Sequence, residues 1–177
     1  IGIWAFSGCT GLKAVYITDI AAWCGIEFAS SSSSPLSYAH NLYLNGELVT
    51  EIVISDGMTS IGQYAFSGCT AEIVWGDDPG ITEIGEYAFY GYKGTSITIP
   101  DSVASIGPYA FAYCTELTSV TIPNRVTSIG EWAFGECSSL TSIIIPDSVT
   151  GIGDSAFFRC YGLTSVTISD RVTSIGI

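Results

Sequence analysis

Cysteine is the reactive residue type with the most regular spacing in this chain of 177 residues. Five of the six cysteines lie three residues after an Ala-Phe pair, namely Cys9, Cys69, Cys114, Cys137 and Cys160. A disulfide needs Cα atoms about 4.4–6.8 Å apart, and the three cysteines of successive units, Cys114, Cys137 and Cys160, cannot all pair with one another. Zinc needs clustered ligands, whereas one thiol per unit gives a line. We interpret the thiols as buried, reduced and packed like small apolar groups; disulfides and metal binding are the alternatives.

Nucleophilic catalysis receives little support from the remaining residues. His40 is the only histidine, and its neighbours Tyr38, Ala39 and Asn41 offer it no evident catalytic partner. A serine nucleophile needs a general base to take its proton, and there is no phosphate-binding motif. We therefore predict that the protein is not an enzyme, with no catalytic residues, no cofactor and no metal ligands.

Acidic residues recur at one position of a repeating unit, at Asp101, Asp147 and Asp170. Aspartate there can bond backbone N–H groups in an Asx turn, and Arg125 and Arg171 could form ion pairs with aspartates of neighbouring units. Calcium requires several oxygen ligands that converge on one ion. Calcium bound by these aspartates is therefore the alternative, and the pair at positions 77 and 78 is a weaker candidate.

Composition restricts the class of partner. The net charge is −12 and the pI is about 4.1, which argues against nucleic acid and anionic membrane surfaces, since both attract basic patches. No apolar run approaches the ~18 residues of a membrane span, so we expect no membrane insertion. The length fits one domain over residues 1–177.

The elements that must position these residues repeat along the chain. Ile-Gly pairs start at positions 1, 61, 84, 106, 129, 152 and 175, so most spacings are 23 residues. A fixed period of this length predicts a solenoid whose units bury their apolar faces by stacking. Each unit combines an alternating segment such as LTSVTIP, a turn and the segment xxAFxxC, which we predict to be a short helical turn. We expect parallel strands centred near residues 16, 53, 74, 98, 121, 144 and 167.

The first two Ile-Gly pairs are 60 residues apart, so the chain carries an insertion at about 19–48. Asp19 could cap a short helix through IAAWC, and the serine run 30–34 is typical of a flexible segment. Asn45-Gly46 between apolar alternations predicts a β-hairpin with a type I′ turn. The sequence gives no path for residues 25–40.

The unit LTSVTIPxxVTSIGxxAFxxC resembles the BspA-like leucine-rich repeat family over residues 1–18 and 49–177. The resemblance implies a curved leucine-rich-repeat solenoid of right-handed α/β type, with a parallel β-sheet on the concave face and short helical turns on the convex face. It also implies a secreted or cell-surface setting and a role in adhesion. The family has no catalytic residues to transfer. Because both ends fall within a unit, we expect a fragment of a longer array, or chains that stack end to end.

Two rows of residues are candidate binding surfaces. The convex row, two positions before each Phe, is mainly aromatic and runs from Trp4 to Trp132. The concave row, which we prefer, holds the outward strand positions and the hairpin: Tyr16, Tyr43, Val53, Val74, Thr98, Thr121, Ile144 and Thr167. We expect Tyr16, Val53 and Val74 to be neighbours in an apolar stripe bounded by Glu51 and Glu72.

We predict a non-enzymatic binding or adhesion module that recognises a protein or glycan, a host or matrix component, through the concave sheet. Repeat proteins build extended concave surfaces of this kind. The alternative is a structural spacer or stalk without a ligand of its own.

Overall fold

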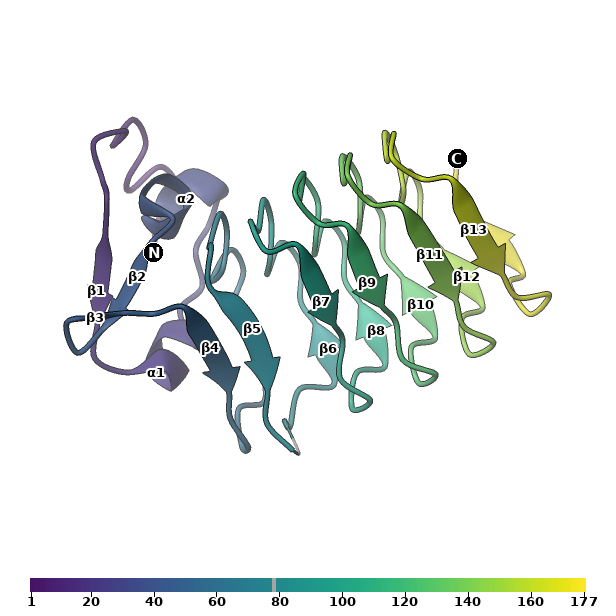
Figure 1. Cartoon of the computed structure of the whole chain (residues 1–177), viewed down its shortest axis with the longest axis horizontal. Helices are drawn as coiled ribbons and strands as arrows, with labels where there is room; N and C mark the ends of the chain where they lie inside the picture. Colours follow the sequence, from purple (N-terminus) through teal and green to yellow (C-terminus); the bar gives the residue numbers. More distant parts are fainter. Residues whose placement is uncertain (78) are drawn as a thin grey trace.

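The computed structural model describes residues 1–77 and 79–177 as a solenoid of stacked coils (Figure 1). One face carries the longer strands, and we call it the long-strand face. All seven predicted strands are confirmed: β1 (Val15–Ile17), β4 (Glu51–Ile54), β5 (Glu72–Trp75), β7 (Ser96–Thr98), β9 (Ser119–Thr121), β11 (Ser142–Ile145) and β13 (Ser165–Ile168). The pairs β4–β5, β7–β9 and β11–β13 are parallel.

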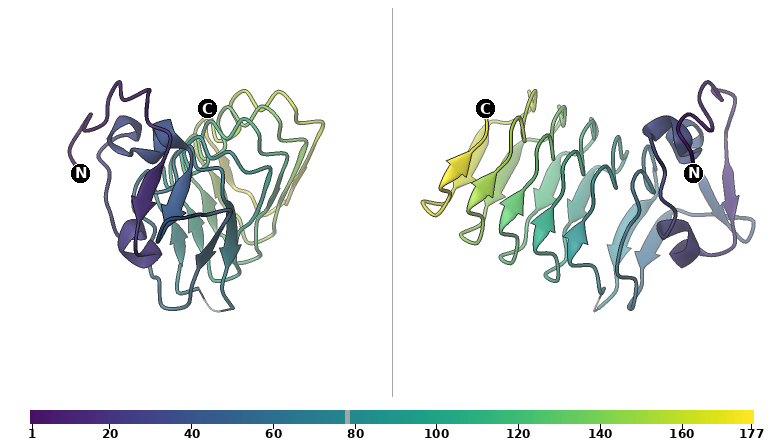
Figure 2. Two further views of the ribbon diagram at one scale, coloured as in Figure 1. Left: turned by 60° about the vertical axis from the view of Figure 1, so that its left-hand side comes forward. Right: turned by 180° about the vertical axis from the view of Figure 1, so that it is seen from behind.

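Among the described residues the long strands are divided among four small sheets, β1-β2-β3, β4-β5, β7-β9 and β11-β13. A continuous parallel sheet of five strands lies on the opposite side of the coils, as the view from behind shows (Figure 2). Its strands have two residues each: β6 (Glu83–Ile84), β8 (Ser105–Ile106), β10 (Ser128–Ile129), β12 (Gly151–Ile152) and β14 (Ser174–Ile175). The sequence indicated only a turn here, because a strand of two residues shows no alternation. The isoleucines of β6, β8, β10 and β12 point into the core and are buried.

The predicted helical turns are wrong. The xxAFxxC segments are turns without helix, and the residue two positions before each Phe has a left-handed backbone, as at Tyr109 (φ 55°) and Trp132 (φ 53°). The backbone N–H of Phe111 donates to the carbonyl of Ala133 at 2.8 Å, and that of Phe134 to Ala156 at 2.8 Å. Since the next coil takes these N–H groups, they are not available for helical bonds within the segment. These turn bonds join neighbouring coils in addition to the strand pairs on the two sheet faces.

The core is organised in columns along the solenoid axis. The rings of Phe66, Phe89, Phe111, Phe134 and Phe157 stack with centroid separations of 5.5, 5.1, 5.3 and 5.5 Å. The predicted phenylalanine column is confirmed, although Phe157 in the last coil is only half-buried. The matching column of Ile106, Ile129 and Ile152 is buried too.

Threonine side chains reinforce the ladder between coils. The hydroxyl of Thr141 donates to the carbonyl of Thr118 at 3.2 Å, and that of Thr164 donates to Thr141 at 3.1 Å. The backbone N–H of Thr141 and that of Thr164 donate to the same two carbonyls. The hydroxyls thus bind the neighbouring coil as well as facing water.

The insertion adds its own coil. Asp19 caps α1 (Ile20–Cys24) as predicted, with its carboxylate accepting from the N–H groups of Ala21 and Ala22 at 2.8 and 3.1 Å. The predicted hairpin is also confirmed: β2 (Leu42–Leu44) and β3 (Glu47–Leu48) are antiparallel around Asn45-Gly46, both with positive φ. Strand β2 also pairs in parallel with β1.

The serine run is ordered rather than flexible. It contains the 3₁₀ helix η1 (Ser31–Ser33) and leads into α2 (Leu36–Ala39). Ser33 is buried and its hydroxyl donates to the carbonyl of Gly2 at 2.7 Å. The prediction failed because local composition cannot show that these hydroxyls find partners in another part of the chain.

Candidate functional site

The outward positions of the long strands reach solvent as expected. Tyr16 and Ile144 are 68% and 67% exposed, and Val53 is 48% exposed. Tyr43 and Val74 are half-buried, and the threonines at positions 98, 121 and 167 are exposed. This face is therefore more apolar near the N-terminal half and at Ile144 than elsewhere.

The structure divides the predicted apolar stripe in two. Tyr16 pairs with Tyr43, and their rings lie 4.8 Å apart with a tilt of 31°. Val53 pairs with Val74 on the adjacent strands β4 and β5. Tyr16 is not the neighbour of Val53, because β2 of the insertion lies beside β1 and belongs to a separate sheet from β4 and β5.

The rest of this face consists of two further cross-strand pairs. Thr98 lies opposite Thr121, and Ile144 opposite Thr167. Glu51 and Glu72 are paired and exposed next to Val53 and Val74. These glutamates therefore lie beside the valine pair only, and the single bordered stripe with Tyr16 that we expected does not form.

The thiol row is buried and hydrogen-bonded between coils. The thiols of Cys114, Cys137 and Cys160 lie 3.2, 3.1 and 3.1 Å from the carbonyl oxygens of Phe89, Phe111 and Phe134. All six cysteines are free, but Cys9 is exposed. Burial raises the pKa of the Cys69 thiol to about 11 and that of Cys160 to about 12. These thiols stay protonated near neutral pH and act as core donors rather than nucleophiles.

The predicted aspartate–arginine ion pairs are wrong for the part of the chain that the structure describes. The ion pairs found there are Lys93–Glu116 at 3.7 Å and Arg159–Glu136 at 2.9 Å. Asp101 lies in a turn closed by Val103 N–H on the carbonyl of Pro100, and its side chain makes no hydrogen bond to a described residue. Residue 78 of the weaker calcium candidate lies outside the described residues. Among the described residues, no group of three or more His, Cys, Asp or Glu side chains is arranged to hold a metal ion.

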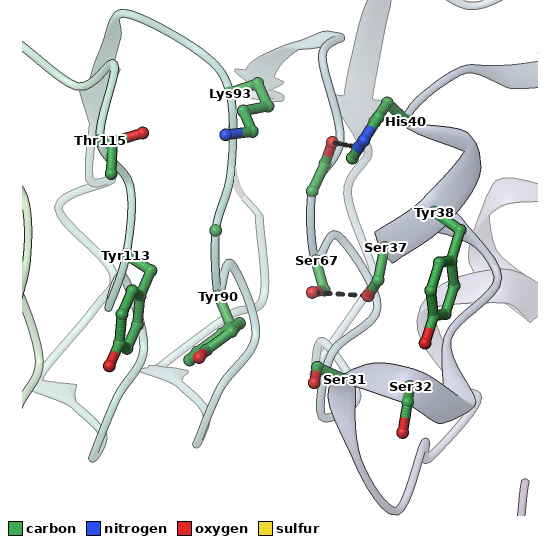
Figure 3. Close-up of a pocket in the computed structure, with 12 residues that line it drawn as sticks. Ser31, Ser32, Ser37, Tyr38, His40, Ser67, Tyr90, Lys93, Tyr113 and Thr115 are labelled. Atoms are coloured by element: carbon green, nitrogen blue, oxygen red, sulfur yellow. Dashed lines mark hydrogen bonds between the residues drawn. The ribbon is translucent and has the colours of Figure 1, made fainter. Parts of the chain in front are cut away.

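A cleft of about 450 Å³ lies between the insertion and the turns of three repeat coils (Figure 3). Ser31, Ser32 and Ser37 come from η1 and α2, and Tyr90 and Tyr113 come from the turns opposite. This cleft was not predicted from the sequence. The signal available was the serine run together with tyrosines in two successive turns, but their meeting depends on the unreadable path of residues 25–40.

Two contacts fix the walls of the cleft at the insertion. The hydroxyl of Ser37 donates to the buried Ser67 at 2.8 Å. The Nδ1 atom of His40 lies 2.9 Å from the carbonyl of Gly68, so Nδ1 carries the proton and donates it, because a carbonyl can only accept. In the neutral ring, Nε2 is then a free acceptor.

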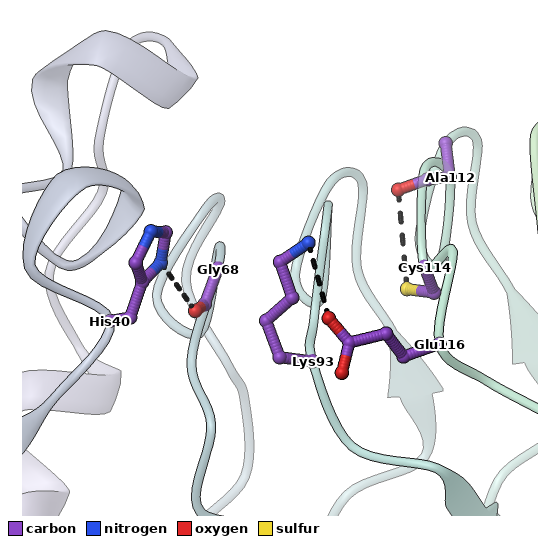
Figure 4. A network of polar contacts seen from close by, with 6 residues as sticks. All are labelled: His40, Gly68, Lys93, Ala112, Cys114 and Glu116. Carbon is purple, nitrogen blue, oxygen red and sulfur yellow. Dashed lines mark hydrogen bonds and ion pairs between the residues drawn. The ribbon is translucent and has the colours of Figure 1, made fainter.

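Lys93 supplies the cationic group of the cleft, and Glu116 lies on the next coil beside it (Figure 4). The rings of Tyr90 and Tyr113 are 5.2 Å apart with a tilt of 46°. Burial, assisted by Tyr113, raises the pKa of Tyr90 to about 12. The Tyr90 phenol is therefore neutral at physiological pH and can both donate and accept a hydrogen bond.

The aromatic row on the turns forms a continuous stack from Tyr64 to Trp132. Successive ring centroids are 4.6, 4.8 and 5.9 Å apart along Tyr64, Tyr87, Tyr109 and Trp132. Trp4, near the N-terminus, is 71% exposed and is not part of this stack. Because the stacked rings cover one another's faces, this row presents mainly ring edges to solvent.

Solved structures of bacterial leucine-rich repeat proteins resemble this chain. One from Bacteroides ovatus is 27% identical, with 99% of this chain and 42% of that chain covered, and a TM-score of 0.66. A leucine rich cell surface protein from Faecalibacterium prausnitzii is 27% identical, covers 96% of this chain and 57% of its own, and has a TM-score of 0.57. A leucine-rich repeat protein from T. pallidum is 29% identical over 72% of this chain and 52% of its own, with a TM-score of 0.55. The chain thus spans about half the length of these relatives.

No curated protein sequence matches the chain. None of the described helices is both long and apolar enough to cross a membrane. The model of the BspA type leucine rich repeat region matches in six copies, over residues 37–117 and 82–177. Together with the stacked parallel strands, this match shows that the chain belongs to the BspA-type leucine-rich repeat family.

Proposed function

We propose that this chain is a non-enzymatic binding module of a secreted or cell-surface bacterial protein, and that the long-strand face receives its partner. The observation that carries the proposal is the exposed Tyr16 ring, which packs against Tyr43 on the neighbouring strand with ring centroids 4.8 Å apart. Exposed aromatic anchors held in place by a neighbour are typical of the centres of protein interfaces. The likeness to a leucine rich cell surface protein supports the proposed setting.

The partner in this proposal is a protein with a basic or uncharged docking surface. Glu51 and Glu72 are exposed beside Val53 and Val74, and the net charge of the chain is −12. Charge of one sign around an apolar centre favours partners of the opposite sign and disfavours acidic ones. A host or matrix component with a basic surface fits this description, and a glycan on the same face is the competing ligand class.

The test is to titrate the purified chain against purified matrix proteins and a glycan array at two salt concentrations. For any binder, Tyr16→Ser should weaken affinity by about 1–2 kcal/mol while the melting temperature stays near that of the parent, because the ring is 68% exposed. The matched control is Thr121→Ser with Thr167→Ser on the same face, which should change neither quantity. A partner whose affinity is equal for parent and Tyr16→Ser would place the binding site elsewhere.

A structural spacer is the second candidate, favoured by the bonds that join neighbouring coils through both the short strands and the turns. Such a rod resists bending and could hold another domain away from a surface. If the chain is a spacer, it has no ligand, and every outward residue on the long-strand face can be substituted without loss of function. Failure of all matrix proteins and glycans to bind the parent would favour it.

A further inference from the structure

The cleft beside the insertion is separate from the long-strand face and has the chemistry of a ligand site. Its volume of about 450 Å³ lies within the range of small-ligand pockets, about 300–1,000 Å³. It extends over three successive coils, through Gly68, Gly91 and Tyr113. Coils repeat about every 4.8 Å, a step close to the length of one pyranose ring in a chain.

The polar groups of the wall are mostly neutral hydroxyls, and several of them have unused bonding capacity. In the described part of the chain, the hydroxyls of Ser31, Tyr90, Tyr113 and Thr115 make no hydrogen bond to protein. Each can donate once and accept as well, and Nε2 of His40 can accept when Nδ1 carries the only ring proton. A ligand that carries many hydroxyl groups of its own would satisfy such a wall in both directions.

Charge disfavours an anionic ligand. The cation Lys93 has Glu116 at 3.7 Å, which offsets its field within the cleft. The net charge of −12 adds a long-range repulsion toward anions. The ligand should therefore be uncharged.

The opposite wall supplies aromatic surface. Tyr113 is 41% exposed, and its ring lies beside Tyr90 on the repeat side of the cleft (Figure 3). Tyr38 on α2 faces them from the insertion, and its hydroxyl is held by the N–H of Gly8 at 3.3 Å. Tyrosine rings pair an apolar face with a polar tip, which matches the C–H face and hydroxyl edge of a pyranose.

We propose that this cleft binds a short stretch of a neutral polysaccharide, with sugar rings against Tyr113 and Tyr90 and sugar hydroxyls on the serine wall. The proposal does not depend on the function of the long-strand face, since no residue of the cleft lies on it. A peptide ligand would instead have to fill the cleft with its side chains, and only its backbone N–H and C=O groups would bond to the wall hydroxyls.

The experiment is saturation-transfer NMR and calorimetry on the intact chain with maltotetraose, cellotetraose, mannotetraose and chitotetraose. At least one should bind with a Kd tighter than about 10 mM. Tyr113→Ala should weaken that binding at least about 10-fold, while Tyr113→Phe, which keeps the ring, should stay within about 3-fold. The matched control is Tyr161→Ala, a 75% exposed tyrosine outside the cleft, which should leave affinity unchanged.

A second measurement guards against a variant that folds poorly. Backbone amide shifts of the ¹⁵N-labelled parent should move at Gly68, Gly91 and Lys93 on addition of the binding tetrasaccharide and stay fixed at Val53 and Ile144. The proposal is overturned if no tetrasaccharide binds, if Tyr113→Ala binds as tightly as the parent, or if the shifts map to the long-strand face.

Discussion

At the residue scale, glycine explains how closely the coils approach one another. None of the glycines in the Ile-Gly pairs has a positive φ, and those of the later coils pack closely against the preceding coil. A Cβ atom on Gly130 would lie 2.6 Å from the carbonyl carbon of Gly107, and one on Gly153 would lie 2.5 Å from the N atom of Glu131. Both distances are to backbone, which cannot rotate away.

Gly130→Ala should therefore destabilise the fold by about 1–3 kcal/mol, the usual cost of overpacking a tight site. Gly11→Ala is the matched control, because its new Cβ would meet nothing within 4 Å; it should change stability by less than about 0.5 kcal/mol. Urea denaturation of both variants measures the difference. Equal stability of the two variants would mean that the coils can separate to admit a methyl group.

At the element scale, the turn segments show how bonding between coils determines local structure. A left-handed backbone costs roughly 1–2 kcal/mol for a residue with a side chain, yet Tyr64, Tyr87, Tyr109 and Trp132 all adopt it. The N–H groups of Tyr109 and Trp132 donate to carbonyls of the next coil at 2.8 and 2.9 Å. These bonds, with the stacking of the rings, offset the strain.

Substitutions in the phenylalanine column should lower the free energy of unfolding more than substitutions in the turns around it. Phe134 is fully buried and stacks on Phe111 and Phe157, so Phe134→Ala should cost roughly 3–5 kcal/mol of unfolding free energy. Phe158→Ala is the matched control at the next turn, where the ring is 40% exposed; it should cost about 1 kcal/mol. Thermal melts of the two variants that differ by less than a degree would contradict the assignment of this column as the centre of the core.

At the scale of the whole molecule, the stacked core makes stability depend on alkaline pH. Burial raises the pKa of Cys24 from 9.0 to about 12, and those of Cys160 and Tyr92 also to about 12. The folded state thus holds protons that the unfolded state releases. These groups contribute full stability below their ordinary pKa values, and that contribution is lost as pH rises from about 9 toward 12.

The urea concentration at the unfolding midpoint should therefore decrease when the pH is raised from 8 to 10.5 at constant ionic strength. The double variant Cys24→Ala, Cys160→Ala should be less stable at pH 8 but lose less on going to pH 10.5, because two of the responsible groups are gone. A parent midpoint that stays constant over this pH range would show that the thiols and phenols are not desolvated as the structure places them.

The sequence alone determined the stacked-coil architecture because every coil of a solenoid repeats the same local residue pattern. Strict alternation in segments such as 117–123 predicted β9 and its equivalents, and the period of 23 residues predicted that they stack in parallel. Asn45-Gly46 and Asp19 likewise identified the hairpin and the start of α1, since both signals are local. The family followed from the same repeated residues.

Only the tertiary structure decided the features that depend on which coil lies beside which. The xxAFxxC segments form turns rather than helices because their backbone N–H groups donate to carbonyls of the next coil. The serine run became ordered because its hydroxyls and carbonyls bond to Gly2 and Phe6. Tyr16 gained Tyr43 instead of Val53 as its neighbour because the insertion folds as an additional coil, and the cleft exists only where that coil meets the repeats. Each of these outcomes is set by contacts between residues more than 20 positions apart, which local patterning does not encode.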